Sequence, residues 1–161
     1  MPHSSVSKDL GFTLAESLIV VAIGGILAAM AIPSMSAAIN RAKLAQATEM
    51  VVASLQEAQR EAIRRNRSCI VTLDKTDRKI VGQQGCLLTG DRILPTEIEL
   101  SHTGDGEIKY GIRGNTTNNE SVVLKVAGSP NYRCLTISAP LGIIRLGSYD
   151  SVAKLCNKLK I

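Results

Sequence analysis

Residues 12–35 form an apolar segment of 24 residues in which Glu16 is the only ionisable side chain. A helix needs about 20 apolar residues to cross the hydrocarbon core of a bilayer, so this segment is long enough to span a membrane. The residues before it are polar and contain no apolar core, unlike an ordinary secretory signal peptide. The segment predicts a membrane helix near the N-terminus, with a carboxylate a few residues inside its start.

The composition changes after Pro33 to alanine, glutamine and charged residues. Apolar residues then recur three or four positions apart, which places them on one stripe of an amphipathic helix. The residues of this stripe, here called the Leu44 stripe, are Leu44, Ala47, Val51, Leu55, Ala58 and Ala62. We predict one helix from Phe12 to about Asn66, with a gentle kink allowed at Pro33. Its second half is expected to pack on the rest of the chain through the Leu44 stripe.

The remainder of the chain has the pattern of β-strands. Short segments rich in β-branched residues alternate with Asp, Gly, Asn and Pro. These segments are residues 69–73, 78–82, 96–101, 107–112, 121–127, 133–138 and 142–147. Two polar stretches, residues 102–107 and 113–120, are expected to be mobile loops. The fold class that follows is α+β, with a long N-terminal helix packed on an antiparallel sheet.

The composition limits what the globular part can bind. With 161 residues and 45% apolar content, the chain is large enough for one domain with a modest core in addition to the N-terminal segment. It has one Phe, three Tyr and no Trp, so aromatic surfaces that could stack on bases or sugars are scarce. The formal net charge of +5 predicts a mild attraction to anionic partners.

The four cysteines have no CxxC spacing and no histidine nearby, which argues against a zinc site and favours disulfides in an oxidising compartment. Cys69 lies in the first predicted strand and Cys86 follows the second, so a hairpin would bring the two together. Cys134 lies in a predicted strand, whereas Cys156 lies in a tail that has no strong strand signal and needs an anchor. We predict the disulfides Cys69–Cys86 and Cys134–Cys156, with four buried free thiols as the alternative.

Groups suited to catalysis or to a cofactor are few. Past residue 11 the chain has one histidine, His102, in the loop-like segment SHTGDG, and spacing indicates no partner base or nucleophile for it. Asp105 and Glu107 are two carboxylates, fewer than an EF-hand-like calcium loop supplies. We therefore predict no enzymatic activity, no cofactor and no metal site.

The start of the apolar segment carries a specific motif. The stretch from Gly11 to Leu14 (GFTL), with Glu16 and the later Pro33, resembles the prepilin-type cleavage and methylation motif of type IV pilins and type II secretion pseudopilins. The resemblance implies that a prepilin peptidase cuts between Gly11 and Phe12 and methylates the new amine of Phe12. It also implies that Glu16 of one subunit pairs with the Phe12 ammonium of a neighbour, which would explain a carboxylate in an apolar layer. A glutamate that reaches the headgroups or caps the first helical turn is the alternative.

The same resemblance implies a pilin-like fold and divides the chain into four parts. They are a prepilin leader (1–11), a transmembrane helix (12–35), an amphipathic continuation of that helix (36–67) and a β-rich periplasmic domain (68–161). Within the last part, residues 108–115 and 132–147 resemble the GspH/FimT branch of minor pseudopilins and minor pilins. The implied location is a single pass through the inner membrane, in contact with its lipid, followed by assembly with other pilins or pseudopilins.

Two functions are compatible with this resemblance. The first is that of a minor subunit that initiates or caps a type II secretion pseudopilus or a type IV pilus. The alternative is DNA uptake, in which a basic patch contacts phosphates and Tyr132 and Tyr149 are the nearby stacking candidates. DNA-binding members of the branch carry a Gly-Arg-x-Arg element, whereas residues 142–145 read GIIR and lack the first arginine. The candidate residues of the patch are Arg133, Arg145, Lys154, Lys158 and Lys160.

Overall fold

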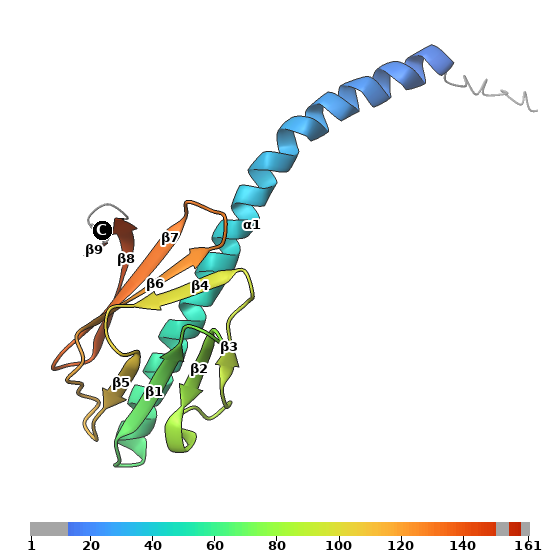
Figure 1. The fold of residues 1–161 in the computed structure, drawn as a ribbon. Helices are drawn as coiled ribbons and strands as arrows, with labels where there is room; N and C mark the ends of the chain where they lie inside the picture. Colours follow the sequence, from blue (N-terminus) through green and yellow to red (C-terminus); the bar gives the residue numbers. More distant parts are fainter. Residues whose placement is uncertain (1–12, 151–154, 159–161) are drawn as a thin grey trace, which may run out of the picture. The chain divides into compact units, whose positions relative to one another are not determined.

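The computed structural model describes residues 13–150 and 155–158. In this part of the chain a long helix, α1 (Leu14–Arg64), precedes a set of antiparallel strands and the short 3-10 helix η1 (Gln83–Gly85), as Figure 1 shows. The strands are β1 (Cys69–Asp74), β2 (Lys79–Gly82), β3 (Arg92–Ile93), β4 (Ile98–His102), β5 (Glu107–Tyr110), β6 (Glu120–Val126), β7 (Tyr132–Ser138), β8 (Ile143–Asp150) and β9 (Leu155–Lys158).

The second half of α1 forms because its residues are mostly strong helix formers, with alanine the commonest, and because no glycine follows Gly25. The helix stops where Asn66 takes a left-handed φ of 50°, and Arg67 N then donates to Ala62 O at 3.2 Å. This is a common way to satisfy the last carbonyls of a helix. Every residue of the Leu44 stripe is at most 2% exposed, so the predicted amphipathic face is confirmed.

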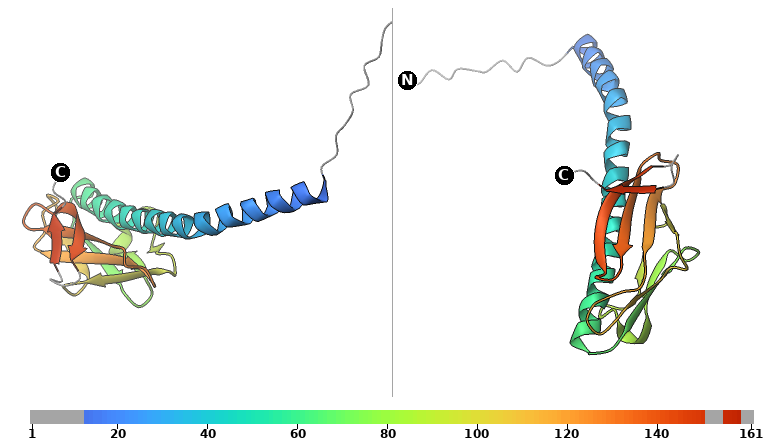
Figure 2. Two further views of the ribbon diagram at one scale, coloured as in Figure 1. Left: turned by 90° about the horizontal axis from the view of Figure 1, so that it is seen from above. Right: turned by 90° about the vertical axis from the view of Figure 1, so that its left-hand side faces the viewer.

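Two antiparallel sheets pack on α1, where the sequence predicted one. Sheet A has the strand order β3-β2-β1-β5, and sheet B has the order β4-β6-β7-β8-β9. Both views in Figure 2 show the green end of α1 lying along these strands. The chain passes from sheet B to sheet A between β4 and β5 and returns to sheet B at β6. This follows from the pairing of β4 with β6 and of β5 with β1. Alternating apolar residues tell which face of a strand is buried but not which strand lies beside it, so this division was not predictable.

Each of the seven predicted strand segments overlaps a strand, and two strands were missed. β3 is only two residues long and pairs with β2. β9 lies in the tail that carried no strand signal, and it pairs with the end of β8. Both are strands because of what they pair with rather than because of their own composition.

The core lies between the Leu44 stripe and the inner faces of both sheets. Sheet A contributes Val71, Leu73 and Ile80, among others, and sheet B contributes Leu124, Leu135 and Ile137. Aliphatic residues dominate this core, in keeping with the low aromatic content of the chain. Internal contacts divide the chain into two compact units, residues 1–38 and 39–161, so the entire core belongs to the second unit.

A polar contact ties the short strand β3 to α1. Arg92 pairs with Glu57 and donates to Ser54 Oγ at 2.9 Å. The other oxygen of Glu57 accepts from Leu88 N at 2.6 Å. The irregular segment between β2 and β3 is therefore held against the helix at two points.

The two segments expected to be mobile loops each make several hydrogen bonds. Thr103 N donates to Ser121 O at 3.0 Å, and Ser121 N donates back to Thr103 Oγ1 at 3.0 Å. Asn118 accepts from Lys109 N at 3.0 Å and donates to Glu107 O at 2.8 Å. Polar side chains that bond to backbone groups have the same composition as solvated ones, which is why the sequence suggested mobility.

Candidate functional site

The first turn of α1 contains Glu16, the predicted assembly residue. Thr13 precedes the helix, and its backbone N–H and its hydroxyl both donate to Glu16 Oε2, at 2.9 and 2.8 Å. Glu16 N donates in turn to Thr13 Oγ1 at 3.3 Å. This reciprocal arrangement is a capping box. Glu16 therefore caps the first turn, which is the alternative role that the sequence left open, while its side chain stays exposed.

The predicted processing residues surround this cap in the sequence. Gly11 and Phe12 lie outside the described residues, and Thr13 follows Phe12 directly. Pro33 lies inside α1, which continues through it. Cleavage before Phe12 would place a new N-terminus one residue from the capping Thr13.

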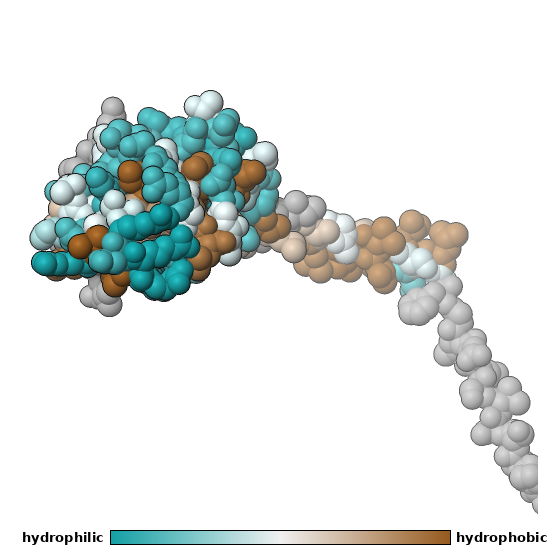
Figure 3. Space-filling model, turned by 90° about the horizontal axis from the view of Figure 1, so that it is seen from below, coloured by the Kyte–Doolittle hydropathy of each residue, from teal (hydrophilic) through white to brown (hydrophobic). Residues whose placement is uncertain are grey.

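Large apolar side chains surround the first half of α1. The consecutive residues Leu18, Ile19, Val20 and Val21 are each more than half exposed, and four consecutive residues cover all sides of a helix. Figure 3 shows the apolar colour over the visible side of this segment. By length and composition the helix can cross a membrane, and its apolar window is not buried by the rest of the described chain. Such a surface needs lipid or apolar partner helices around it.

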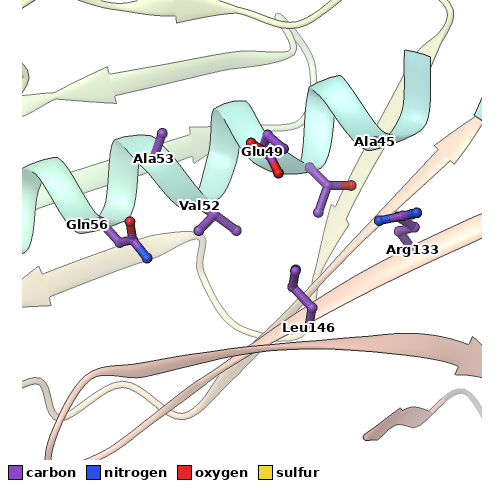
Figure 4. Close-up of a pocket in the computed structure, with 8 residues that line it drawn as sticks. Ala45, Glu49, Val52, Ala53, Gln56, Arg133 and Leu146 are labelled. Atoms are coloured by element: carbon purple, nitrogen blue, oxygen red, sulfur yellow. The ribbon is translucent and has the colours of Figure 1, made fainter. Parts of the chain in front are cut away.

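A groove lies between the second half of α1 and sheet B (Figure 4). Its volume is about 270 Å³, and its lining includes Glu49 and Val52 from α1, Arg133 from β7 and Leu146 from β8. Leu146 is 45% exposed. Arg133 has no ion-pair partner among the described residues. The lining thus combines apolar side chains with the Glu49 carboxylate and the Arg133 guanidinium.

The two arginines of the predicted basic patch are on opposite faces of sheet B. Thr136 of β7 pairs with Arg145 of β8, so these two side chains share a face. Arg133 lies three positions before Thr136, and side chains alternate along a strand, so Arg133 is on the other face, toward α1. The structure therefore does not bring Arg133 and Arg145 together.

The remaining members of the patch lie near the C-terminus. Lys158 is in β9, whereas Lys154 and Lys160 fall outside the described residues. The stacking candidates Tyr132 and Tyr149 contact each other, with ring centroids 5.5 Å apart. Because the two rings pack together as a cross-strand pair, each offers less free surface to a base than an isolated ring would.

The cysteines form two disulfides in the predicted pairing. Cys69 of β1 joins Cys86, which directly follows η1, with the Cα atoms 5.6 Å apart. Cys134 of β7 joins Cys156 of β9, with the Cα atoms 5.8 Å apart. Each sheet thus carries one disulfide, and the second one anchors the C-terminal strand.

Groups for chemistry do not converge in the described part of the chain. His102 Nδ1 lies 2.8 Å from Gly104 O, a contact within its own turn. No three His, Cys, Asp or Glu side chains among the described residues are placed to hold a metal ion together. The N-terminal half of α1 and the groove therefore remain the features that an assembly function can use.

Comparison with known proteins identifies the family. Residues 6–32 match the family described as the prokaryotic N-terminal methylation motif. The type IV major fimbrial protein FimA of Dichelobacter nodosus is 36% identical over 116 residues, which cover 70% of this chain and 69% of that protein. The chain belongs to the type IV pilin family.

Solved structures share the fold of this pilin. The type IV minor pilin FimU of Pseudomonas aeruginosa aligns with a TM-score of 0.53 at 17% identity, covering 70% of this chain and 92% of that one. The minor pseudopilin EpsH of the Vibrio cholerae type 2 secretion system aligns with a TM-score of 0.55 at 15% identity, covering 66% and 97%. The predicted pilin-like α+β fold is confirmed, and so is the resemblance to minor pilins and pseudopilins.

The sequence analysis did not identify Thr13 as the partner of Glu16, nor Glu49 and Leu146 as residues that line a groove with Arg133. The Thr-x-x-Glu spacing of Thr13 and Glu16 is a known capping-box signature and could have identified Thr13. Glu49 and Leu146 carried no such signal, because they line one groove only after β8 has folded beside α1.

Proposed function

We propose that this pilin is a minor structural subunit that initiates or caps a type IV pilus or a type II secretion pseudopilus. The observation that carries the proposal is the first half of α1, which is apolar on all sides and is not covered by the rest of the described chain. A chain of this kind needs a bilayer before assembly and neighbouring helices after it. The fold shared with a minor pilin and a minor pseudopilin supports a structural subunit of the pilin type, and the minor role is the finer part of the proposal.

In this proposal the subunit is first inserted into the inner membrane and processed there. A prepilin peptidase removes residues 1–11 and methylates Phe12, and the protein crosses the membrane once, in contact with its lipid. Residues after the membrane helix lie in the periplasm. The two disulfides support this placement, because such bonds persist in oxidising compartments.

Glu16 is proposed to act in two successive states. In the membrane the Thr13 donors occupy Glu16 Oε2, so the carboxylate is partly satisfied without a partner subunit. A carboxylate has about four lone-pair positions, so these two bonds leave room for the Phe12 ammonium of a neighbour. Pairing with that ammonium in an apolar filament core would favour assembly and fix the axial register.

The processing step is tested by comparing a glycine-to-alanine substitution at the cleavage site with the same substitution at a control position. Gly11→Ala should leave the leader attached and keep the protein in the inner membrane, whereas Gly24→Ala should be processed normally, since nothing lies within 4 Å of a Cβ added at Gly24. Intact-mass spectrometry of the filament fraction should show wild type and Gly24→Ala beginning at N-methylated Phe12. Assembled protein that still carries residues 1–11 would contradict the proposal.

DNA uptake, the alternative function, receives less support. Phosphate-binding grooves need several cations on one surface, but Arg133 faces the α1 groove and Arg145 the opposite side of sheet B. We therefore rank DNA uptake below the structural role. Salt-sensitive retention of the protein on duplex DNA at physiological ionic strength would reverse this ranking.

A further inference from the structure

Glu120, at the start of β6, is a buried carboxyl group without full hydrogen bonding. Glu120 is 6% exposed, and its Oε2 has no hydrogen-bond partner among the residues that the structure describes. The other oxygen, Oε1, accepts only a long contact of 3.4 Å from Asn118 Nδ2. An ionised carboxylate in such a position is costly unless a cation or a proton neutralises it.

The segment that covers Glu120 connects the two sheets. Residues 103–106 lead from β4 in sheet B to β5 in sheet A. At one end Thr103 N donates to Ser121 O at 3.0 Å, and at the other Leu73 N donates to Gly106 O at 2.8 Å. A Cβ at Gly104 would lie 2.5 Å from Glu120 Oε1, so the backbone of this segment rests directly on the carboxyl group.

The charged neighbours of Glu120 come from two elements. Burial raises the pKa of the Glu120 carboxyl above its ordinary 4.5, and the nearby Asp105 carboxylate raises it further. Hydrogen bonding to Asn118 and the charge of His102, at the end of β4, lower the pKa by smaller amounts. The other titratable groups acting on Glu120 are thus Asp105, in the segment 103–106, and His102, in β4.

We propose that Glu120 and Asp105 form a proton-binding pair that fastens the segment 103–106 across the two sheets when protonated and loosens it when both groups are ionised. The proton on Glu120 removes one of two like charges and makes the carboxyl a donor toward Asp105. Its loss to solvent leaves two like charges near each other beneath a segment that is then held by the hydrogen bonds of Thr103 and Gly106 and by the contact of His102 with Gly104 O.

The direction of the pH dependence follows from linkage. In the opened segment Glu120 is hydrated and has an ordinary pKa, whereas in the closed segment its pKa is raised. The closed state is therefore favoured fully below the ordinary value, and this advantage is lost as pH rises to the raised value. Within that window the opening equilibrium constant should increase about tenfold for each pH unit.

The test uses the full chain in detergent micelles between pH 4.5 and 8. Amide hydrogen exchange at Leu73 and Thr103, corrected for the intrinsic pH dependence, reports opening of the segment. In wild type the corrected opening constant should rise about tenfold per pH unit over the window. Glu120→Gln should abolish this rise, because the amide has nothing to ionise, and Asp105→Asn should move it to lower pH.

Two controls separate the pair from its surroundings. His102→Gln removes the other titratable neighbour and should leave the rise in place. Glu99→Gln changes an exposed carboxylate on the same sheet and should behave as wild type. An unchanged pH response in Glu120→Gln would overturn the proposal. Recovery of wild-type protection at pH 7.5 by millimolar calcium, absent in Glu120→Gln, would also overturn it by assigning the pair to a divalent cation.

Discussion

At the scale of single residues, Glu16 has a local role in the capping box and a proposed role in pairing with a neighbouring subunit. The capping box gives the side chain a structural use within its own subunit, so its presence alone does not prove pairing with a neighbour. Capping needs an oxygen acceptor, whereas pairing with an ammonium gains most from a negative charge. Two substitutions can therefore separate the roles.

Glu16→Gln keeps an oxygen for the Thr13 donors but removes the charge, and Thr13→Val removes the capping hydroxyl but keeps the charge. We expect Glu16→Gln to insert into the membrane and to be lost from filaments. Thr13→Val should weaken the first turn by about 1 kcal/mol and still assemble. Quantitative blotting of membrane and filament fractions measures both. Normal incorporation of Glu16→Gln would show that the charge is not needed.

The basic residues show where residue-scale prediction reached its limit. Whether Arg133 and Arg145 share a face depends on the pairing of Thr136 with Arg145. That register is set by the conformation of the turn at residues 139–142, and a shift of one residue would exchange the two faces. Charge clustering in the sequence therefore suggested one patch, whereas the folded sheet separates Arg133 from Arg145.

At the scale of elements, α1 was the most predictable part of the fold. A period of three to four apolar residues is a local property, and it identified all six buried positions of the Leu44 stripe. The bounds also agreed closely, since helix ends are set by local signals such as Asn66. β3 and β9 were missed because their strand conformation depends on pairing with β2 and β8.

Leu55 is the position at which the helix–sheet packing is best tested. Leu55 is fully buried and Leu88 is 61% exposed, so the same change to alanine has different consequences. Leu55→Ala should lower the free energy of unfolding by about 2–5 kcal/mol, and Leu88→Ala by less than about 1 kcal/mol. Denaturant unfolding of the full chain in micelles, followed by circular dichroism, gives both values. Equal losses would mean that α1 does not pack on the sheets through this stripe.

At the scale of the whole molecule, the fold class could be predicted but the strand pairing could not. The helix and the alternating segments specify an α+β domain, and the short hairpin between β1 and β2 brings Cys69 near Cys86. The placement of β4 in sheet B and of β5 in sheet A depends on contacts between residues distant in sequence, and such contacts leave no local pattern. The burial of Glu120 could not be predicted from the sequence, because it results from the segment 103–106 crossing over this side chain.

The disulfide pairing predicts two linked peptides after trypsin digestion without reduction. Residues 68–75 should be joined to residues 80–92, and residues 134–145 to residues 155–158. Replacing either pair by alanine should cost about 3 kcal/mol from the lost loop constraint, plus any packing change. A peptide joining Cys86 to Cys156, or four thiols that alkylate in the unfolded, unreduced protein, would contradict the pairing.

The disulfides also determine how this protein responds to a pulling force. Cys134–Cys156 encloses a loop with a sequence separation of 22, and Cys69–Cys86 one with a separation of 17. At about 3.4 Å per extended residue, the two loops hide roughly 130 Å of contour length. A stretched subunit would not release that length even after its sheets had separated. The disulfide would also keep β9 attached to β7. Single-molecule extension should therefore gain this length only in the presence of a reductant.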